Sequence, residues 1–180
     1  MVETGLASWY GAPYHNRKTA NGETYNMNEM TAAHRTLPLN SVVRVVNPKT
    51  GSEAVVRITD RGPFIRGRII DLSLAAAKAL DVWRAGVAPV RLEVLETPSS
   101  LEEGGRWAVQ IGGFEKEKDA RELQDRLSRR YRTANVLAFG SPTGHWWVRV
   151  RVLGDDRGRA HEVAGIAPAP EEKVFLVRLD

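Results

Sequence analysis

The sequence predicts two small domains, a β-barrel followed by an α+β domain, and three observations support this. First, 180 residues provide one ordinary domain or two small ones. Second, residues 96–105 are polar, rich in turn-forming residues and without periodicity, which is typical of a linker. Third, short strand and turn patterns dominate before this segment, whereas strand and helix patterns alternate after it. We therefore expect domains at 1–95 and 106–180.

The first half contains short strand patterns and one helix. Two valine-rich segments are joined by the turn formers of 47–51, which predicts a hairpin-like connection. Ser73 is placed to cap a helix over 74–80. Strands are expected at 6–10, 41–46, 53–58, 69–70 and 89–95, with a tight turn at 21–22. Many short strands with one helix favour a small all-β barrel.

The second half follows the order β-α-β-β-α-β. Apolar residues alternate over 107–112, which predicts a strand, and recur at helical spacing over 115–132, which predicts a helix. Further elements are expected as strands at 134–139, 145–153 and 174–179 and as a helix at 155–165. This order predicts a sheet backed on one face by two helices.

The strand over 145–153 has two chemically different faces. Its valines lie on one face and should pack on the helices, whereas Trp147 and Arg149 lie on the other. Together with the amide of Gln110 on the first strand, they offer a stacking ring and hydrogen-bonding groups for a sugar with hydroxyls and carboxylates. The alternative interpretation is a tryptophan covered by a loop and arginines paired with acids.

The composition excludes several classes of function. The chain has no cysteine, so disulfides, thiolate metal sites and cysteine nucleophiles are excluded. No apolar run approaches the roughly 20 residues that span a bilayer, and the first residues lack the pattern of a signal peptide. The net charge of +4 is too small to indicate nucleic-acid binding. RNA binding by the second half is an alternative because sheet-face aromatics stack bases, but residues 97–180 carry 14 basic and 13 acidic residues, a net charge of only +1.

Four residues in the first half are candidates for acid–base chemistry, and each also has a structural explanation. Glu23 follows a turn and can be solvated, and His34 can form hydrogen bonds within the barrel. Asp60 can fix the turn that follows it, a common role for aspartate, and Asp71 can anchor the start of the helix. Taken singly, none of them identifies a site.

The order of several motifs carries a resemblance to a known family. The motifs are GLASWYG at 5–11, TANGE at 19–23, TAAHRTLP at 31–38, ITDRGPF at 58–64 and GRIIDLS at 67–73. In this order they resemble the rare lipoprotein A (RlpA) family of bacterial cell-wall enzymes. The resemblance covers 5–95 and implies a six-stranded double-psi β-barrel. The segment WAVQIGGF at 107–114, with Trp147 and Arg149, resembles a SPOR domain, which binds glycan strands stripped of stem peptides.

The resemblance implies a lytic transglycosylase. Such an enzyme cleaves the β-1,4 bond between N-acetylmuramic acid and N-acetylglucosamine; the C6 hydroxyl of the muramic residue attacks its own anomeric carbon and leaves a 1,6-anhydro end. One carboxyl group can serve in turn as acid and base. The family's functional positions fall on Asp60, the expected acid/base, and on Glu23 and His34, which hold the substrate or orient Asp60; Asp71 is the second candidate. Substrate-binding residues are expected at Trp9, Tyr10, Arg61, Asp71, Gln110, Trp147 and Arg149. No metal or cofactor is expected.

The implied partner is a peptide-free, or denuded, peptidoglycan strand. Its free lactyl carboxylates suit the mild positive charge, and the implied place is the bacterial cell envelope at the division septum, in the periplasm as an outer-membrane lipoprotein or secreted. We expect a monomer without a nucleic-acid partner, and a lipid-anchoring cysteine that lies upstream of Met1 or is lacking. Gly113 stands where SPOR domains commonly have serine, which removes one possible hydrogen bond to sugar. The alternatives are a non-catalytic, expansin-like wall-binding protein and a hydrolase that leaves reducing ends.

Overall fold

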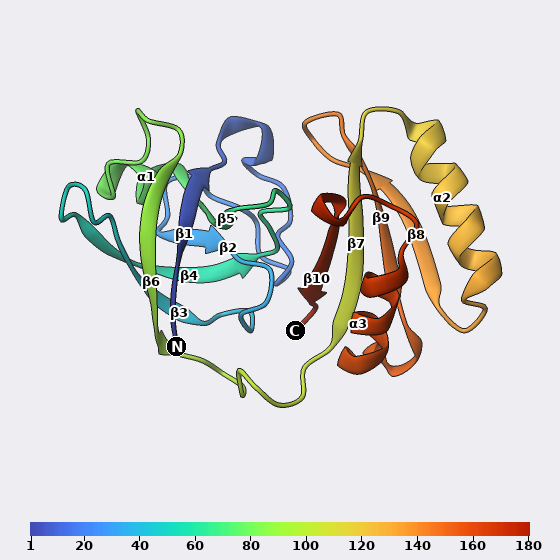
Figure 1. Ribbon diagram of the computed structural model, residues 1–180. Helices are drawn as coiled ribbons and strands as arrows, with labels where there is room; N and C mark the ends of the chain where they lie inside the picture. Colours follow the sequence, from blue (N-terminus) through green and yellow to red (C-terminus); the bar gives the residue numbers. More distant parts are fainter. The chain divides into compact units, whose positions relative to one another are not determined.

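The computed structural model describes all 180 residues, which form two compact units (Figure 1). The first consists mainly of residues 1–103 and the second mainly of residues 104–179. The first is a closed six-stranded barrel, and the second is a four-stranded sheet with helices, so the predicted fold class is confirmed. None of the helices combines the length and apolar character required to cross a bilayer.

The barrel strands follow the order β1-β5-β2-β4-β3-β6. Two pairs, β1 with β5 and β2 with β4, are parallel, and the other neighbours are antiparallel. The strands are β1 Val2–Trp9, β2 Thr31–Ala33, β3 Val42–Val46, β4 Glu53–Asp60, β5 Arg68–Leu72 and β6 Ala88–Glu96. The strand β2 was not predicted from the sequence, and it lies between β4 and β5, where it positions the candidate site.

The barrel encloses an aliphatic core. Buried residues from every part of the barrel wall contribute to it, among them Val43, Ile58, Ile70 and Leu72. The single α-helix of this unit is α1, Leu74–Ala79, and the hydroxyl of Ser73 accepts a hydrogen bond from the Ala76 N–H at 3.2 Å. This confirms the predicted N-cap. A short 3₁₀ helix covers Ala12–Tyr14.

The second unit is an antiparallel sheet in the order β10-β7-β9-β8. Its elements are β7 Trp107–Phe114, α2 Glu117–Arg130, β8 Asn135–Gly140, β9 Trp146–Arg151, a 3₁₀ helix Leu153–Asp155, α3 Arg157–Ile166, a 3₁₀ helix Glu171–Lys173 and β10 Val174–Arg178. Figure 1 shows α2 and α3 on one side of the sheet. Val148 and Val150 of β9 are fully buried in the core shared with these helices, which confirms the predicted aliphatic face.

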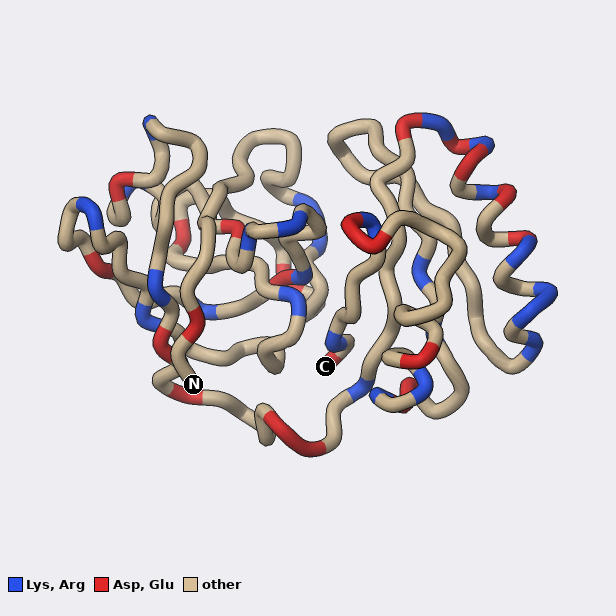
Figure 2. Tube along the Cα trace, viewed as in Figure 1, with Lys and Arg blue, Asp and Glu red and all other residues tan.

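The outer surface of α2 carries charges of both signs along its length (Figure 2). Four of these charges form two pairs across one helical turn: Arg121 lies 3.2 Å from Glu117, and Lys118 lies 3.8 Å from Glu122. Exposed pairs of this kind contribute only about 0.3–0.5 kcal/mol each. The apolar face of α2, formed by Ala120, Leu123 and Leu127, therefore holds the helix on the sheet.

Candidate functional site

Two carboxyl groups lie on either side of β2 in the barrel wall. Ala33 of β2 pairs with Asp60 of β4 on one side and with Asp71 of β5 on the other, and Asp71 pairs in turn with Ser8 of β1. Directly paired residues project on the same face of a sheet. Neighbouring strands lie 4.7–4.9 Å apart, which places the backbones of the two aspartates about 10 Å apart. We call Ser8, Asp71, Ala33 and Asp60 the carboxyl row.

Asp60 is held in one orientation by backbone donors. Its Oδ1 accepts hydrogen bonds from the N–H groups of Ala20 at 3.1 Å and Arg61 at 2.9 Å. Its own carbonyl accepts the N–H of His34 at 3.0 Å. Asp60 ends β4 and is only partly buried. The Asp60 carboxylate is thus fixed in orientation while it stays partly exposed.

Asp71 has a different environment. The hydroxyl of Ser8, itself buried, donates a hydrogen bond to Asp71 Oδ1. Burial raises the pKa of Asp71, and the negative charge of Asp60 raises it further, whereas Ser8 and the guanidinium groups of Arg68 and Arg35 act in the opposite direction. Burial dominates, so Asp71 holds a proton more readily than an ordinary aspartate.

Three tyrosines form an aromatic wall beside the carboxyl row. Tyr10 follows β1 and stacks on Tyr25, with ring centroids 4.4 Å apart, while Tyr14 meets its edge at 5.5 Å. The Tyr25 hydroxyl donates to the Tyr10 carbonyl at 2.7 Å. Burial raises the pKa of both Tyr10 and Tyr25, that of Tyr25 to about 12, and the charge of Asp60 contributes to each shift. Both hydroxyls therefore stay protonated at neutral pH, next to Asp60.

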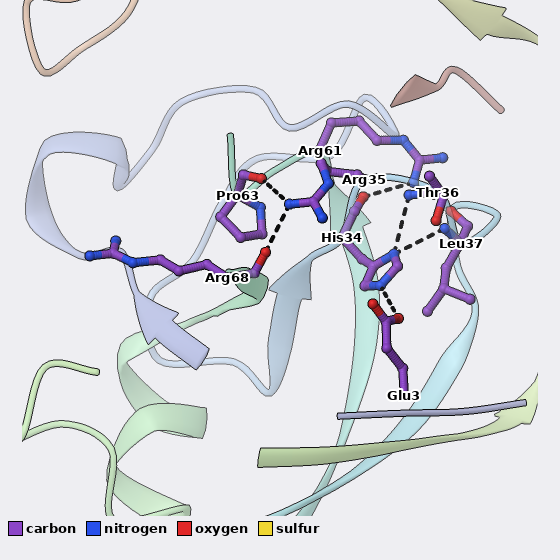
Figure 3. A network of polar contacts seen from close by, with 8 residues as sticks. All are labelled: Glu3, His34, Arg35, Thr36, Leu37, Arg61, Pro63 and Arg68. Carbon is purple, nitrogen blue, oxygen red and sulfur yellow. Dashed lines mark hydrogen bonds and ion pairs between the residues drawn. The ribbon is translucent and has the colours of Figure 1, made fainter. Parts of the chain in front are cut away.

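His34 directly follows β2 in the sequence, and both of its ring nitrogens form hydrogen bonds (Figure 3). Nδ1 accepts the backbone N–H groups of Thr36 at 3.2 Å and Leu37 at 3.1 Å, and Nε2 lies 3.1 Å from the Glu3 carboxylate. An acceptor at Nδ1 leaves the proton on Nε2, which donates to Glu3. Burial lowers the pKa of His34, in spite of Glu3, so the ring is neutral near pH 7. In this arrangement His34 positions the chain around Asp60, through its backbone, and does not present its ring to a substrate.

The guanidinium of Arg61 reaches the loop that follows β2. Its Nη1 donates to the carbonyls of His34 at 3.0 Å and Leu37, so it holds the same loop as His34. Arg35 has a parallel role, because its Nη1 donates to the carbonyls of Pro63 at 2.6 Å and Arg68 at 2.8 Å (Figure 3). The geometry gives Arg61 a structural task in addition to the predicted contact with substrate.

Glu23 lies at the surface and is paired with Arg57. The two carboxylate oxygens lie 2.9 and 2.8 Å from the two guanidinium nitrogens, a bidentate pair. This pair lowers the pKa of Glu23, so the side chain is ionised and does not serve as a proton donor at neutral pH. The loop that carries Glu23 also supplies the Ala20 N–H to Asp60. Glu23 therefore braces the segment that orients Asp60.

Trp9, the last residue of β1, packs against the barrel core. A Cβ atom at Gly11 would lie 2.8 Å from the Trp9 ring, so the glycine allows the close approach of chain and indole. One side of the ring is thereby used within the barrel. The predicted contact of Trp9 with substrate would use the part of the indole that the barrel does not cover.

In the second unit, the three predicted residues lie together on the face that neither helix covers. Gln110 of β7 pairs in register with Arg149 of β9, and its buried Oε1 accepts from Arg149 Nε at 3.1 Å and Nη2 at 2.6 Å. The Arg149 guanidinium also lies 5.4 Å from the ring centre of Phe139. Trp147, two residues before Arg149, shares this face. The predicted combination of an indole, a guanidinium and an amide is therefore present.

The glycine that departs from the SPOR pattern lies under the Trp147 ring. A Cβ atom at Gly113 would be 3.2 Å from Trp147 and 3.0 Å from His145, which is tighter than an ordinary contact. A Cβ at Gly112 would meet the ring at 2.9 Å. The two glycines let the indole lie flat on β7. A serine at position 113 would displace it, so the glycine changes the seating of the ring as well as the number of hydroxyls.

Sequence reasoning missed several residues that support the site. The Ser8 hydroxyl bonds to Asp71, and the Tyr25 ring stacks on Tyr10. Ala33 separates the two aspartates, and the Glu3 carboxylate bonds to the His34 ring. Ser8 and Ala33 fall within the motifs at 5–11 and 31–38, and their place in these motifs was the only sequence feature that could have pointed to them. No group of three or more histidine, aspartate or glutamate side chains is arranged to hold a metal ion.

Comparison with known proteins decides the family. The family model described as "Lytic transglycolase" matches residues 2–92, which is half of the chain. The chain belongs to the lytic transglycolase family. A second model, described as "SPOR domain", matches residues 103–169. Both family resemblances seen in the sequence are thus confirmed, and with them the predicted double-psi barrel and SPOR fold.

Several curated relatives of this lytic transglycolase family member carry the name "Endolytic peptidoglycan transglycosylase RlpA". The protein from Campylobacter jejuni is 42% identical over 153 residues, which cover 72% of this chain and 55% of the relative. The protein from Helicobacter pylori strain J99 is 41% identical over 165 residues, covering 75% of this chain and 52% of the relative. The protein from Vibrio cholerae is 56% identical over 95 residues, covering 53% of this chain and 36% of the relative. The chain spans about half the length of the first two.

Proposed function

We propose that the chain is an endolytic peptidoglycan lytic transglycosylase that cleaves the bond between N-acetylmuramic acid and N-acetylglucosamine. The names of its relatives and the match to the lytic transglycolase family support this activity. The observation that carries the proposal is the carboxyl row, which places Asp60 and Asp71 on either side of Ala33. Two carboxyl groups in different environments can divide the roles of acid and base between them.

The two aspartates divide the proton transfers in this proposal. Asp71, whose burial favours the protonated form, donates its proton to the oxygen that leaves with the N-acetylglucosamine residue. Asp60, fixed by two backbone N–H groups, accepts the proton of the C6 hydroxyl. The C6 oxygen then bonds to the anomeric carbon as the glycosidic bond breaks, which leaves a 1,6-anhydro end. Water takes no part, so the spacing rules for hydrolases do not apply. The sequence alone led us to assign both transfers to Asp60.

The surrounding residues act on Asp60 in this scheme. The neutral ring of His34 and the guanidinium of Arg61 hold the loop behind β4, and the Glu23–Arg57 pair fixes the loop whose N–H group bonds to Asp60. The aromatic wall of Tyr10, Tyr14 and Tyr25 provides a surface against which a sugar ring can stack. Their effect on the rate arises from orientation.

We further propose that the second unit binds the glycan strand and directs the enzyme to the septal wall in the cell envelope. The match to the SPOR domain and the cluster of Trp147, Arg149 and Gln110 support this. An arginine and an indole suit a sugar with a lactyl carboxylate, which a denuded strand displays on every muramic residue. Recognition of denuded strands, a lipid anchor and a monomeric state stay predictions.

Digestion of purified peptide-free glycan strands tests the activity. We expect products with 1,6-anhydro ends by mass spectrometry, and at least a hundredfold slower release with D60N or D71N, given that positioned acid–base groups contribute 10²–10⁴-fold. The E53Q variant is the matched control, because Glu53 is an exposed carboxylate at the other end of β4. Reducing ends would instead identify a hydrolase. No products at any concentration, with strand binding retained, would identify the non-catalytic wall-binding protein.

A further inference from the structure

The barrel unit has a surface hollow at the C-terminal end of α1. Its volume is about 450 Å³, within the range of small-ligand sites, and it is lined by Lys78, Asp81, Trp83 and Arg84. Figure 1 shows α1 and the segment that follows it at the edge of the barrel. The N-cap of the helix is Ser73, two residues after Asp71, so the hollow lies at the opposite end of the helix from the carboxyl row.

Trp83 is displayed on an ordered segment. Its neighbour Val82 and the preceding Leu80 are fully buried in the barrel core, whereas 41% of Trp83 is exposed. The N–H groups of Val82 and Trp83 both donate to the carbonyl of Ala77, at 2.9 and 3.1 Å. The other large exposed apolar side chains of the barrel unit are aliphatic or methionine. Trp83 therefore combines a rigid backbone with an accessible ring, as a stacking residue does.

Two cations lie over the Trp83 ring. The ammonium of Lys78 is 5.1 Å from the ring centre and the guanidinium carbon of Arg84 is 5.9 Å from it. The carboxylate of Asp81 accepts a hydrogen bond from the hydroxyl of Ser52 at 2.5 Å, which directs one of its oxygens to the β3–β4 turn. The hollow thus combines an aromatic face with a net positive charge. Its complement is a ring with an apolar face and a carboxylate.

We propose that this hollow binds a carboxylated sugar of the glycan strand, a muramic residue with a free lactyl group, at a distance from the bond that is cleaved. The identity of the polymer rests on the proposed function. Six helical residues at 1.5 Å each separate the ends of α1 by about 9 Å, so the hollow takes a different sugar from the one at the carboxyl row. The sugar face stacks on Trp83, and the carboxylate lies between Lys78 and Arg84. The hollow is a remote subsite that selects strands over short fragments.

Nuclear magnetic resonance on the full chain tests the subsite. The D71N variant prevents cleavage, and the Trp83 indole N–H signal is identified by its loss in W83F. Three probes separate the chemistry: purified peptide-free glycan strands, chito-oligosaccharides, which have the rings without carboxylates, and poly-L-glutamate, which has carboxylates without rings. We expect a saturable shift of the Trp83 signal with glycan strands, a weaker one with chito-oligosaccharides and none with poly-L-glutamate.

Variants of the two cations complete the test. K78A with R84A should weaken glycan binding at Trp83 about fivefold or more while leaving chito-oligosaccharide binding unchanged, and K49A, at the exposed β3–β4 turn, is the control. An unmoved Trp83 signal with glycan strands, or an equal response to poly-L-glutamate, overturns the subsite. Cleavage is measured separately with W83A in an otherwise unaltered chain. A chain that does not cleave but shows the shift refutes the proposed function and leaves the subsite in place.

Discussion

Replacement of His34 by asparagine and by glutamine separates the two hydrogen-bonding roles of its ring. Nδ1 accepts two backbone N–H groups, and Nε2 donates to Glu3. In H34N the side-chain oxygen lies near the position of Nδ1 and can accept from the same N–H groups. In H34Q the side-chain nitrogen can reach the position of Nε2, but the acceptor for the backbone is lost. The two variants therefore remove opposite halves of one network.

The structure sets the size of the two effects. The Leu37 N–H belongs to a buried residue and the Thr36 N–H to a half-buried one, and an unsatisfied buried donor costs about 1–3 kcal/mol. H34Q should therefore lower the free energy of unfolding by roughly 2–5 kcal/mol. In H34N the Glu3 carboxylate loses its donor, but its side chain is 30% exposed and water replaces the bond, so the cost is roughly 1 kcal/mol.

The pH dependence supplies a second signature. Burial is the largest cause that lowers the pKa of His34 below 6.5, and the charges of Arg35 and Arg61 add to it, whereas Glu3 opposes it. The unfolded chain therefore binds a proton near pH 6.5 that the folded chain binds only at lower pH. The neutral ring contributes stability above pH 6.5, and this contribution is lost as the pH falls, by up to about 1.4 kcal/mol per pH unit. Neither variant carries this titrating ring, so the difference in free energy of unfolding between parent and variant should shrink below pH 6.5.

Urea unfolding at pH 7.5, 6.5 and 5.5, followed by circular dichroism, measures both quantities for the barrel transition. The lowered pKa of Glu3, from an ordinary value of 4.5, affects stability only at lower pH and does not interfere. An H34N variant as unstable as H34Q would refute the assignment of Nδ1 as an acceptor. A gap that does not change between pH 7.5 and 5.5 would refute the neutral buried ring.

Three further predictions concern the carboxyl row and the second unit. D71N should raise the Tm of the barrel at pH 7, by roughly 2–8 °C per kcal/mol gained. The pKa of Asp71 is raised in the folded chain, so the carboxyl group stabilises the fold below pH 3.8 and this contribution is lost as the pH rises through the folded-state pKa. A Tm below the parent's at pH 7 would contradict this. A33L should slow strand cleavage roughly a hundredfold in a timed digestion, because the added carbons separate substrate from both carboxyl groups, and it should cost about 1–3 kcal/mol of stability by overpacking a residue that is 4% exposed; unchanged cleavage would remove Ala33 from the site. W147A should weaken glycan binding by about 1–3 kcal/mol in isothermal titration, as loss of a stacking ring does, and unchanged affinity in a folded variant would exclude the ring from the site.

Sequence patterns predicted most of the elements, but they missed β2. The three residues Thr31–Ala33 are too few to show alternation, and alanine has little preference for strands. All three are buried, because β2 is flanked by β4 and β5 and is held by its neighbours' pairing and not by its own propensity. The long alternating strand β6, in contrast, was located within one residue at each end, and β7 was located at its first residue, with only its last two residues missed.

The same non-local pairing explains what the sequence revealed of the site. The motifs identified Asp60 and Asp71 as candidates, but their registration across Ala33 depends on one parallel and one antiparallel pairing between three separate segments. Which nitrogen of the His34 ring accepts a hydrogen bond depends on the backbone N–H groups of the next turn, which no residue pattern encodes. Trp147, by comparison, follows from strand alternation alone, and its face was predicted correctly.

The proposed groups differ in the kinetic parameter that they should control, and this follows from where each meets the strand. In the proposed reaction Asp60 and Asp71 act on the bond being broken, so their loss should lower kcat with little effect on KM. The proposed contacts of Trp83 and Trp147 are with sugars whose bonds do not change, and such contacts are equally strong in the ground state and the transition state. Their loss therefore raises KM for long strands and leaves kcat unaltered. Because the two rings lie on one chain, each weak contact raises the effective concentration of strand at the other. An enzyme built in this way acts on strands and not on disaccharides, which is the behaviour that an endolytic transglycosylase requires.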